Sequence, residues 1–297
     1  MKRKIITVLA CLSFLATPAF ALNVQLDAGN EGYTGTDFDA DTLTDPWDEA
    51  SIRADTATTQ FDDDGDGEVS VGDSFTDSGH AKWIGYNFLP GTDSDSEGLD
   101  DAGGYDVTVE WDNLTGYVDQ ISGENNTNHN TVYTGGSFDF YFDPTHDTDF
   151  GDTTRPSDDT GFDSGGGDEA HMMTISSLTG TGTNTFDADG DFQQGSSQFL
   201  GQITFLEEGY LQEYPSGLDL NNYISLNWLF SELNQNTQSG GIIQEDTGQE
   251  NELFTVYSRH DGSMSFEVIP EPTTLLLFGT GLIGLAGFGR RKFFKKN

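Results

Sequence analysis

Tyr105-Asp106-Val107-Thr108-Val109-Glu110-Trp111-Asp112 is the stretch of sequence that decides the fold. Its side chains alternate with a period of two, so an extended chain carries four apolar residues on one face and four polar residues on the other. A helix repeats every ~3.6 residues and would scatter the same apolar residues around its surface. The segment therefore predicts a β-strand with one buried face.

Similar patterns recur between residues 22 and 269. Phe138, Phe140 and Phe142 repeat the alternation beside Asp139 and Asp143. Short apolar runs bounded by Gly, Asn, Asp or Ser predict further strands at 200–206, 223–230, 254–257 and 264–269. Residues 218–233 are the one plausible helix, and we expect a strand at their centre. Many short strands with Gly-rich turns predict an all-β protein, an antiparallel β-sandwich or jelly roll with long acidic loops.

The chain is strongly acidic, with 51 Asp and Glu against 12 Lys and Arg and a formal net charge of −39. Most cations lie at the two ends, and those left between residues 22 and 269 are Arg53, Lys82, Arg155 and Arg259. This balance excludes a nucleic-acid binder of the usual basic kind. Such a charge repels itself in a compact state, so we expect bound cations or screening salt to support the fold. A saline habitat would explain the acidity without any specific partner.

The N-terminus has the three parts of a secretory signal peptide. A basic start at residues 1–4 precedes an apolar run at 5–16, and Ala19 and Ala21 supply small residues at positions −3 and −1 of a signal-peptidase site. We expect residues 1–21 to be removed, so that the mature chain begins at Leu22. Two alternatives are an uncleaved anchor and a lipoprotein modified at Cys11, although Cys11 follows only a short apolar run. It is the sole cysteine, so the mature chain has no internal disulfide.

The C-terminus predicts a membrane span. Residues 273–289 contain no charged side chain, and 17 residues is the short limit for crossing the hydrocarbon core. A basic cluster follows, made of Arg290, Arg291, Lys292, Lys295 and Lys296. Such a cluster orients a span with its C-terminus in the cytoplasm. The alternative, a buried core helix, is opposed by these five cations.

Pro270-Glu271-Pro272 stands directly before this span, and its two prolines favour an extended backbone that suits a peptidase cleft. The order of these three parts over residues 270–297 resembles the PEP-CTERM sorting signal, also catalogued as the ice-binding protein C-terminal domain. The resemblance implies export, transient anchoring in the inner membrane and processing by an exosortase-type enzyme. It also implies a mature product at the cell surface, in biofilm or in flocs, together with extracellular polysaccharide. Three domains follow: signal peptide 1–21, acidic β-rich body 22–269 and sorting signal 270–297.

The sharpest chemical motif runs from Asp62 to Asp73. With Asp62 at position 1 and Gly67 at position 6, it has the spacing of an EF-hand calcium loop, and the Asp at position 12 resembles the dockerin variant. Hard Ca²⁺ takes six to eight oxygen ligands. The candidate ligands are Asp62, Asp64, Asp66, Glu68, Ser70 and Asp73. The flanking segments are poor helix formers and only one full loop is visible, so an ordinary acidic β-turn is the alternative.

No catalytic constellation is visible in the sequence. The histidines are scattered without metal-ligand spacing, and no nucleophile elbow or phosphate-binding loop is present. We therefore expect a non-enzymatic surface or matrix protein, stabilised by calcium and associated with extracellular polysaccharide. The alternative is a calcium-dependent carbohydrate-binding module or glycosidase. An exposed aromatic platform with convergent polar side chains would favour the alternative, whereas Trp83, Trp111 and Trp228 are better explained by core packing.

Overall fold

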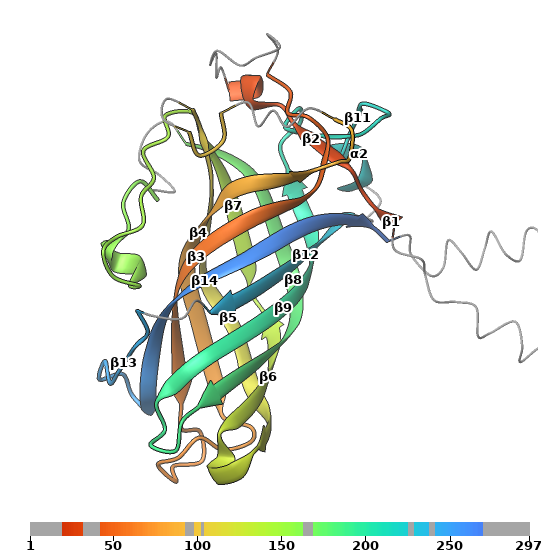
Figure 1. Cartoon of the computed structure of the whole chain (residues 1–297). Coiled ribbons are helices and arrows are strands. Elements are labelled where there is room, and N and C mark those ends of the chain that lie inside the picture. Colours follow the sequence, from red (N-terminus) through yellow and green to blue (C-terminus); the bar gives the residue numbers. More distant parts are fainter. Residues whose placement is uncertain are drawn as a thin grey trace, which may run out of the picture.

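The computed structural model describes residues 20–31, 42–92, 98–101, 104–162, 169–224, 229–237 and 241–269. Most of them form antiparallel strands (Figure 1). The strands are β1 (Phe20–Ala21), β2 (Val24–Leu26), β3 (Trp47–Phe61), β4 (Ser74–Phe88), β5 (Asp106–Ser122), β6 (Asn128–Gly135), β7 (Ser137–Asp143), β8 (Ala170–Phe186), β9 (Phe192–Leu206), β10 (Leu211–Glu213), β11 (Leu218–Asp219), β12 (Leu229–Thr237), β13 (Ile243–Glu245) and β14 (Glu252–Val268). The helical turns are η2 (Ala28–Glu31), η3 (Glu124–Asn126), η4 (Pro156–Asp158) and α2 (Asn221–Ile224).

A single sheet closes on itself. Its hydrogen-bonded order runs β3, β4, β5, then β6 with β7, then β8, β9, β12 and β14, and β14 pairs again with β3. β6 and β7 share one place in the ring because each pairs with both β5 and β8. Figure 1 shows these strands tilted around a common axis. The result is a closed antiparallel barrel with eight strand positions.

The structure confirms an all-β antiparallel fold but not two packed sheets. The alternation in β5 buries one face in a sandwich and in a closed sheet alike, so it does not distinguish them. Closure depends on β14 pairing with β3, for example Arg259 with Asp55, which are far apart in sequence. The strands expected at 254–257 and 264–269 are both parts of β14.

The strand expected at 223–230 is only partly present. Residues Asn221–Ile224 form the helical turn α2, and β12 begins at Leu229, after a gap at 225–228 in the described chain. Asp219 explains the turn, because its Oδ1 accepts a hydrogen bond of 2.8 Å from the Asn221 N–H and favours a helical start there.

One half of the closed sheet is filled by aromatic side chains. Trp47 and Trp83 are fully buried and meet edge to face at 5.6 Å between ring centroids, and Phe140 packs against Trp83. β2, β10, β11 and α2 cover this end of the sheet, which we call the cap end (Figure 1). Leu26 and Leu211 from this cap belong to the same hydrophobic core.

The other half, which ends in the β3–β4 hairpin, has a mixed polar interior. It contains a cavity of about 50 Å³, lined among others by Thr58, Asp77 and His260. Phe186 and Phe192 form a second apolar cluster with Val256 near this end. A cavity of this size holds a few water molecules at most.

The long segment between β7 and β8 lies along the outside of the closed sheet. The Lys82 ammonium donates to the Thr148 carbonyl at 3.2 Å, and Phe162 stacks on the His80 ring with a centroid distance of 4.8 Å. Asp106 and Thr108 face outward on β5, yet both are fully buried. The first part of the outer polar side of this strand is therefore shielded from water, and the loop contributes by contacting Asp106.

No helix among the described residues has the length and apolarity to cross a membrane. The span expected at 273–289 lies outside the described residues.

Candidate functional site

The Asp62–Asp73 loop connects β3 to β4 at the hairpin end of the closed sheet. Asp62 organises it, because its Oδ1 accepts from the N–H groups of Gly65 at 2.6 Å and Asp66 at 3.2 Å, and its Oδ2 accepts from that of Gly67 at 2.9 Å. Gly67 has φ of 82°, a conformation that favours glycine, which explains glycine at position 6. The loop folds inward around its first carboxylate.

This folding gathers three of the predicted ligands. Asp62, Asp64 and Asp66 each offer an oxygen within 4.8 Å of the others. Desolvation raises the pKa of Asp62, but the N–H groups of Gly67, Gly65 and Asp66 outweigh it and hold that pKa below its usual value. The Asp66 N–H lowers the pKa of Asp64, but desolvation and the nearby carboxylates of Asp66, Asp73 and Asp62 raise it above its usual value. A bound divalent cation would relieve this repulsion.

The other predicted ligands have internal roles. The Ser70 hydroxyl donates to Asp66 Oδ2 at 3.1 Å, and the Glu68 N–H donates to Asp66 Oδ1 at 2.8 Å. Asp73 is buried and accepts from the N–H groups of Asp63 at 3.1 Å and Ser70 at 2.6 Å. Strands, not helices, flank the loop, so it lacks the helix–loop–helix frame of an EF-hand.

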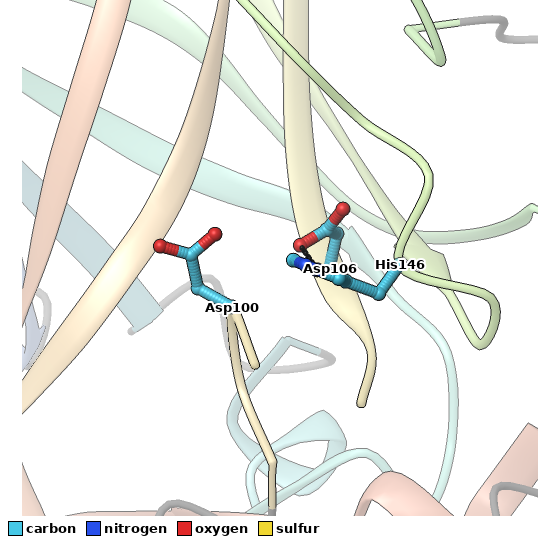
Figure 2. A group of neighbouring side chains, drawn as sticks. All are labelled: Asp100, Asp106 and His146. Atoms are coloured by element: carbon cyan, nitrogen blue, oxygen red, sulfur yellow. Dashed lines mark hydrogen bonds and ion pairs between the residues drawn. The ribbon is translucent and has the colours of Figure 1, made fainter. Parts of the chain in front are cut away.

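A second acidic group lies outside the sheet and was missed in the sequence. Figure 2 shows the His146 ring turned toward the Asp106 carboxylate, with Asp100 on a neighbouring segment. His146 Nδ1 is 2.7 Å from Asp106 Oδ1, and the Thr148 N–H donates to Asp106 Oδ2 at 3.2 Å. Asp100 and Asp106 are close in sequence, but His146 is 40 residues beyond Asp106, so no local spacing indicates the group.

Lys82 brings a positive charge to this group. Its Nζ is 2.7 Å from Asp100 Oδ1 and 3.9 Å from Asp106 Oδ1. An ammonium at this position supplies the positive charge that a metal would bring. The group is therefore an ion-pair network that fixes the segment after β7 to β4 and β5.

Several titratable groups line the interior cavity, among them Asp77 and His260. Asp77 accepts from Trp111 Nε1 at 2.6 Å and from the Thr58 hydroxyl at 2.7 Å, and burial raises its pKa to about 6. Burial lowers the pKa of His260 to about 4, and its Nε2 lies 2.8 Å from the Ser258 hydroxyl. A serine and a histidine at this distance resemble a nucleophile and its base. Their cavity of about 50 Å³ is too small for an organic substrate.

Three aromatic rings, two exposed and one half-buried, form a ladder on the outside of the sheet, near its cap end. Tyr141 of β7, His171 of β8 and Phe205 of β9 lie on adjacent strands. The His171 and Phe205 rings stack at 4.8 Å with an interplanar angle of 7°, and the His171 and Tyr141 centroids are 5.3 Å apart. Phe205 is 37% exposed. The sequence gives no signal for this ladder, because the strand register brings the rings together.

The predicted processing sites are mostly outside the described residues. Ala19, Pro270, Glu271, Pro272 and the basic cluster at 290–296 all lie there. Ala21 is in β1, and Leu22 is buried with its N–H donating to the Phe266 carbonyl at 3.0 Å.

Comparison with known proteins identifies one segment. Residues 268–292 match the PEP-CTERM protein-sorting motif. This motif marks an exported protein that carries a C-terminal sorting signal and is processed by an exosortase-type enzyme. No curated protein sequence matches the chain.

Two solved structures show weak similarity. Both are of Ail, the attachment invasion locus protein of Yersinia pestis, one of them in complex with the heparin analogue sucrose octasulfate. The identities are 9% and 8%, and the TM-scores are 0.15 and 0.16. Each alignment covers 74% of this chain and 99% of the other. At such low TM-scores the similarity supports no inference about this chain.

Proposed function

We propose that this chain is a non-enzymatic protein of the cell surface or extracellular matrix, which associates with extracellular polysaccharide in biofilm or floc formation. The match of residues 268–292 to the sorting motif carries the proposal, because it gives the route by which the body reaches the exterior. Signal peptidase and an exosortase-type enzyme process the precursor, and the inner membrane holds it transiently.

Calcium stabilises the body through the Asp62–Asp73 loop in this proposal. The support is the convergence of Asp62, Asp64 and Asp66, whose oxygens lie within 4.8 Å of one another. Ca²⁺ would be held by these carboxylates, with Glu68, Ser70 and Asp73 completing or bracing the site. Because the loop joins β3 to β4, a cation there ties together two strands of the closed sheet.

Thermal unfolding of the full chain with and without Ca²⁺, at fixed ionic strength and with Mg²⁺ for comparison, tests the calcium site. A ligand of the native state alone adds about 2.7 kcal/mol at 100 times its Kd, so Ca²⁺ should raise Tm with concentration. The double variant Asp62→Ala/Asp66→Ala should lose this rise. Equal effects of Ca²⁺ and Mg²⁺, or none, would leave the loop an acidic turn.

The Asp187–Asp191 turn between β8 and β9 provides the matched control. Asp187 Oδ1 accepts from the N–H groups of Asp189 at 2.9 Å and Asp191 at 3.0 Å, so it is folded like the first turn of the candidate loop. Phe192 follows where the candidate loop has its glycine. The variant Asp187→Ala/Asp189→Ala should keep the full response to Ca²⁺.

A carbohydrate-binding module is the second candidate function. The observation that favours it is the exposed ladder of Tyr141, His171 and Phe205, because aromatic faces stack on the C–H faces of sugar rings. Thr174 lies beside the ladder, with its hydroxyl 3.0 Å from His171 Nε2. Both candidate functions have carbohydrate as the ligand. They differ because a carbohydrate-binding module recognises it at one defined surface.

A further inference from the structure

One outer face of the closed sheet carries an ordered array of side chains, most of them polar and uncharged. The strand register aligns Asn130, Thr183, Ser196 and Asn236 in one row across β6, β8, β9 and β12. The next row contains Val132, Thr181, Gln198 and Asn234, and a third contains Thr179, Leu200 and Glu232. We call these eleven positions the threonine face. Most of its side chains are exposed or half-buried, and Leu200 is 38% exposed.

The charge of this face differs from that of the chain. The protein has a net charge of −39, yet Glu232 is the only charged residue among these eleven positions, and Glu267 of β14 lies beside it along the depression described below. Gln198 donates a hydrogen bond to that carboxylate. A polycationic partner would favour the acidic surfaces elsewhere, and a polyanionic partner would be repelled by the chain as a whole. The face therefore suits an uncharged partner.

The surface over these strands is hollowed along its length. Depressions of about 710, 290 and 230 Å³ are lined by its residues. The first two share Thr181 and Gln198, and the last two share Thr183, Ser196 and Asn236. They therefore join into one shallow trough that crosses several strands. An open trough of this kind suits a long chain molecule better than a small ligand, which is usually enclosed in a pocket.

The side chains match the chemistry of sugars. Each threonine hydroxyl both donates and accepts, and each Asn or Gln amide does the same. The threonine methyl groups, Val132 and Leu200 offer apolar contacts for the C–H faces of sugar rings. Strand geometry repeats these groups about every 4.8 Å across the sheet and about every 6.8 Å along it. A repeating polymer can therefore make many similar contacts at once.

We propose that the threonine face binds a neutral polysaccharide, with the ladder of Tyr141, His171 and Phe205 continuing the site toward the cap end. This inference rests on the proposed function, which includes association with extracellular polysaccharide, and adds the class of polymer and the place of binding. Affinity comes from many weak contacts along one chain, so long polymers bind more tightly than short oligosaccharides.

Affinity electrophoresis tests the proposal. The full chain, purified in a detergent without sugar groups, is run through native gels containing dextran, galactomannan, mixed-linkage β-glucan or the anionic polymer alginate. We expect retardation by at least one neutral polymer and none by alginate. The variant Thr181→Val/Thr183→Val keeps the shape and strand preference of threonine, and it should weaken binding about 30-fold, the effect of two ordinary hydrogen bonds. Phe205→Ala should weaken it as well.

Thr76→Val/Thr115→Val is the matched control. Thr76 of β4 and Thr115 of β5 are exposed cross-strand partners outside the threonine face. This variant should bind like the wild type, and unchanged Tm and circular dichroism spectra establish that each variant is folded.

The outcomes separate this inference from the proposed function. If a neutral polymer retards the wild type and Thr181→Val/Thr183→Val equally, the threonine face is not the binding site, but the protein still associates with polysaccharide. Retardation by alginate alone overturns the choice of a neutral polymer. Absence of retardation by every polymer overturns both proposals. Self-association that the variant abolishes, measured by sedimentation equilibrium, would instead make the face an interface between copies of this chain.

Discussion

Asp77 is expected to destabilise the folded protein at neutral pH, and Asp77→Asn should remove this effect. The carboxyl group lies inside the closed sheet, where burial raises its pKa from 3.8 to about 6. Thr58 and Trp111 donate to it and lower the pKa, but burial has the larger effect. The folded state therefore binds the proton of Asp77 more tightly than the unfolded state does.

The size of the effect follows from this difference in pKa. One pKa unit corresponds to about 1.4 kcal/mol, so the difference between 3.8 and about 6 amounts to about 3 kcal/mol. Between these pH values the folded state holds more protons, so the contribution of Asp77 to stability falls as pH rises. This contribution is fully present below 3.8, the pKa of Asp77 in the unfolded state, and is lost above about 6, its pKa in the folded state. Asparagine has no such titration and still presents an oxygen to Trp111.

Denaturant unfolding of the full chain between pH 4.5 and 8, at constant ionic strength, measures the effect. The free energy of unfolding of Asp77→Asn minus that of the wild type should increase by about 2 kcal/mol between pH 4.5 and 8, because the wild type has already lost part of the total of about 3 kcal/mol at pH 4.5. His260 lines the same cavity and titrates in the opposite sense, but it is present in both proteins and its contribution largely cancels. Asp119→Asn, at an exposed position of β5, should show no such trend. A difference independent of pH, or one that decreases with pH, would refute the argument.

Two further predictions concern the cations and the sorting signal. Arg259 makes a bidentate ion pair with fully buried Asp55, at 2.7 and 2.6 Å, so Arg259→Met should cost about 3–5 kcal/mol of unfolding free energy. The exposed ion pair of Arg53 and Asp261 is the control, and Arg53→Met should change the free energy of unfolding by less than about 1 kcal/mol. Similar losses of stability in both variants would contradict the argument that burial makes the Arg259–Asp55 pair important. Replacing Pro270-Glu271-Pro272 by three alanines should cause unprocessed precursor to accumulate, visible as a larger band on immunoblots, and normal processing of that variant would show that cleavage does not depend on the motif.

Local sequence patterns predicted the local structure well. Val107, Val109 and Trp111 are buried on one side of β5, as their alternation indicates, and the phenylalanines of β7 follow the same rule. The turns of the Asp62–Asp73 loop could also be predicted from the sequence. Glycines with positive φ and carboxylates that accept backbone N–H bonds act within a few residues.

Contacts between distant segments could not be predicted in this way. Asp106 and Thr108 lie on the polar face that the alternation assigns to solvent, but both are fully buried, and His146 and Thr148 of the segment after β7 contact Asp106. Nothing local to Lys82 indicates that it joins Asp100, Asp106 and the Thr148 carbonyl. Asp77 occupies an inward position of β4, and only its partners Thr58 and Trp111 explain why a carboxyl group is accommodated there.

The sequence by itself determined that the chain is all-β, exported and provided with a sorting signal at residues 268–292, because strand alternation and targeting signals are encoded in contiguous residues. The tertiary structure alone decided that β14 returns to β3 and closes the sheet. Closure in turn created the threonine face and the aromatic ladder, since both consist of residues that meet only through the register of neighbouring strands. The two-residue alternation of a strand determines which face of the sheet each side chain occupies. The hydrogen bonds between strands distant in sequence determine which side chains become neighbours.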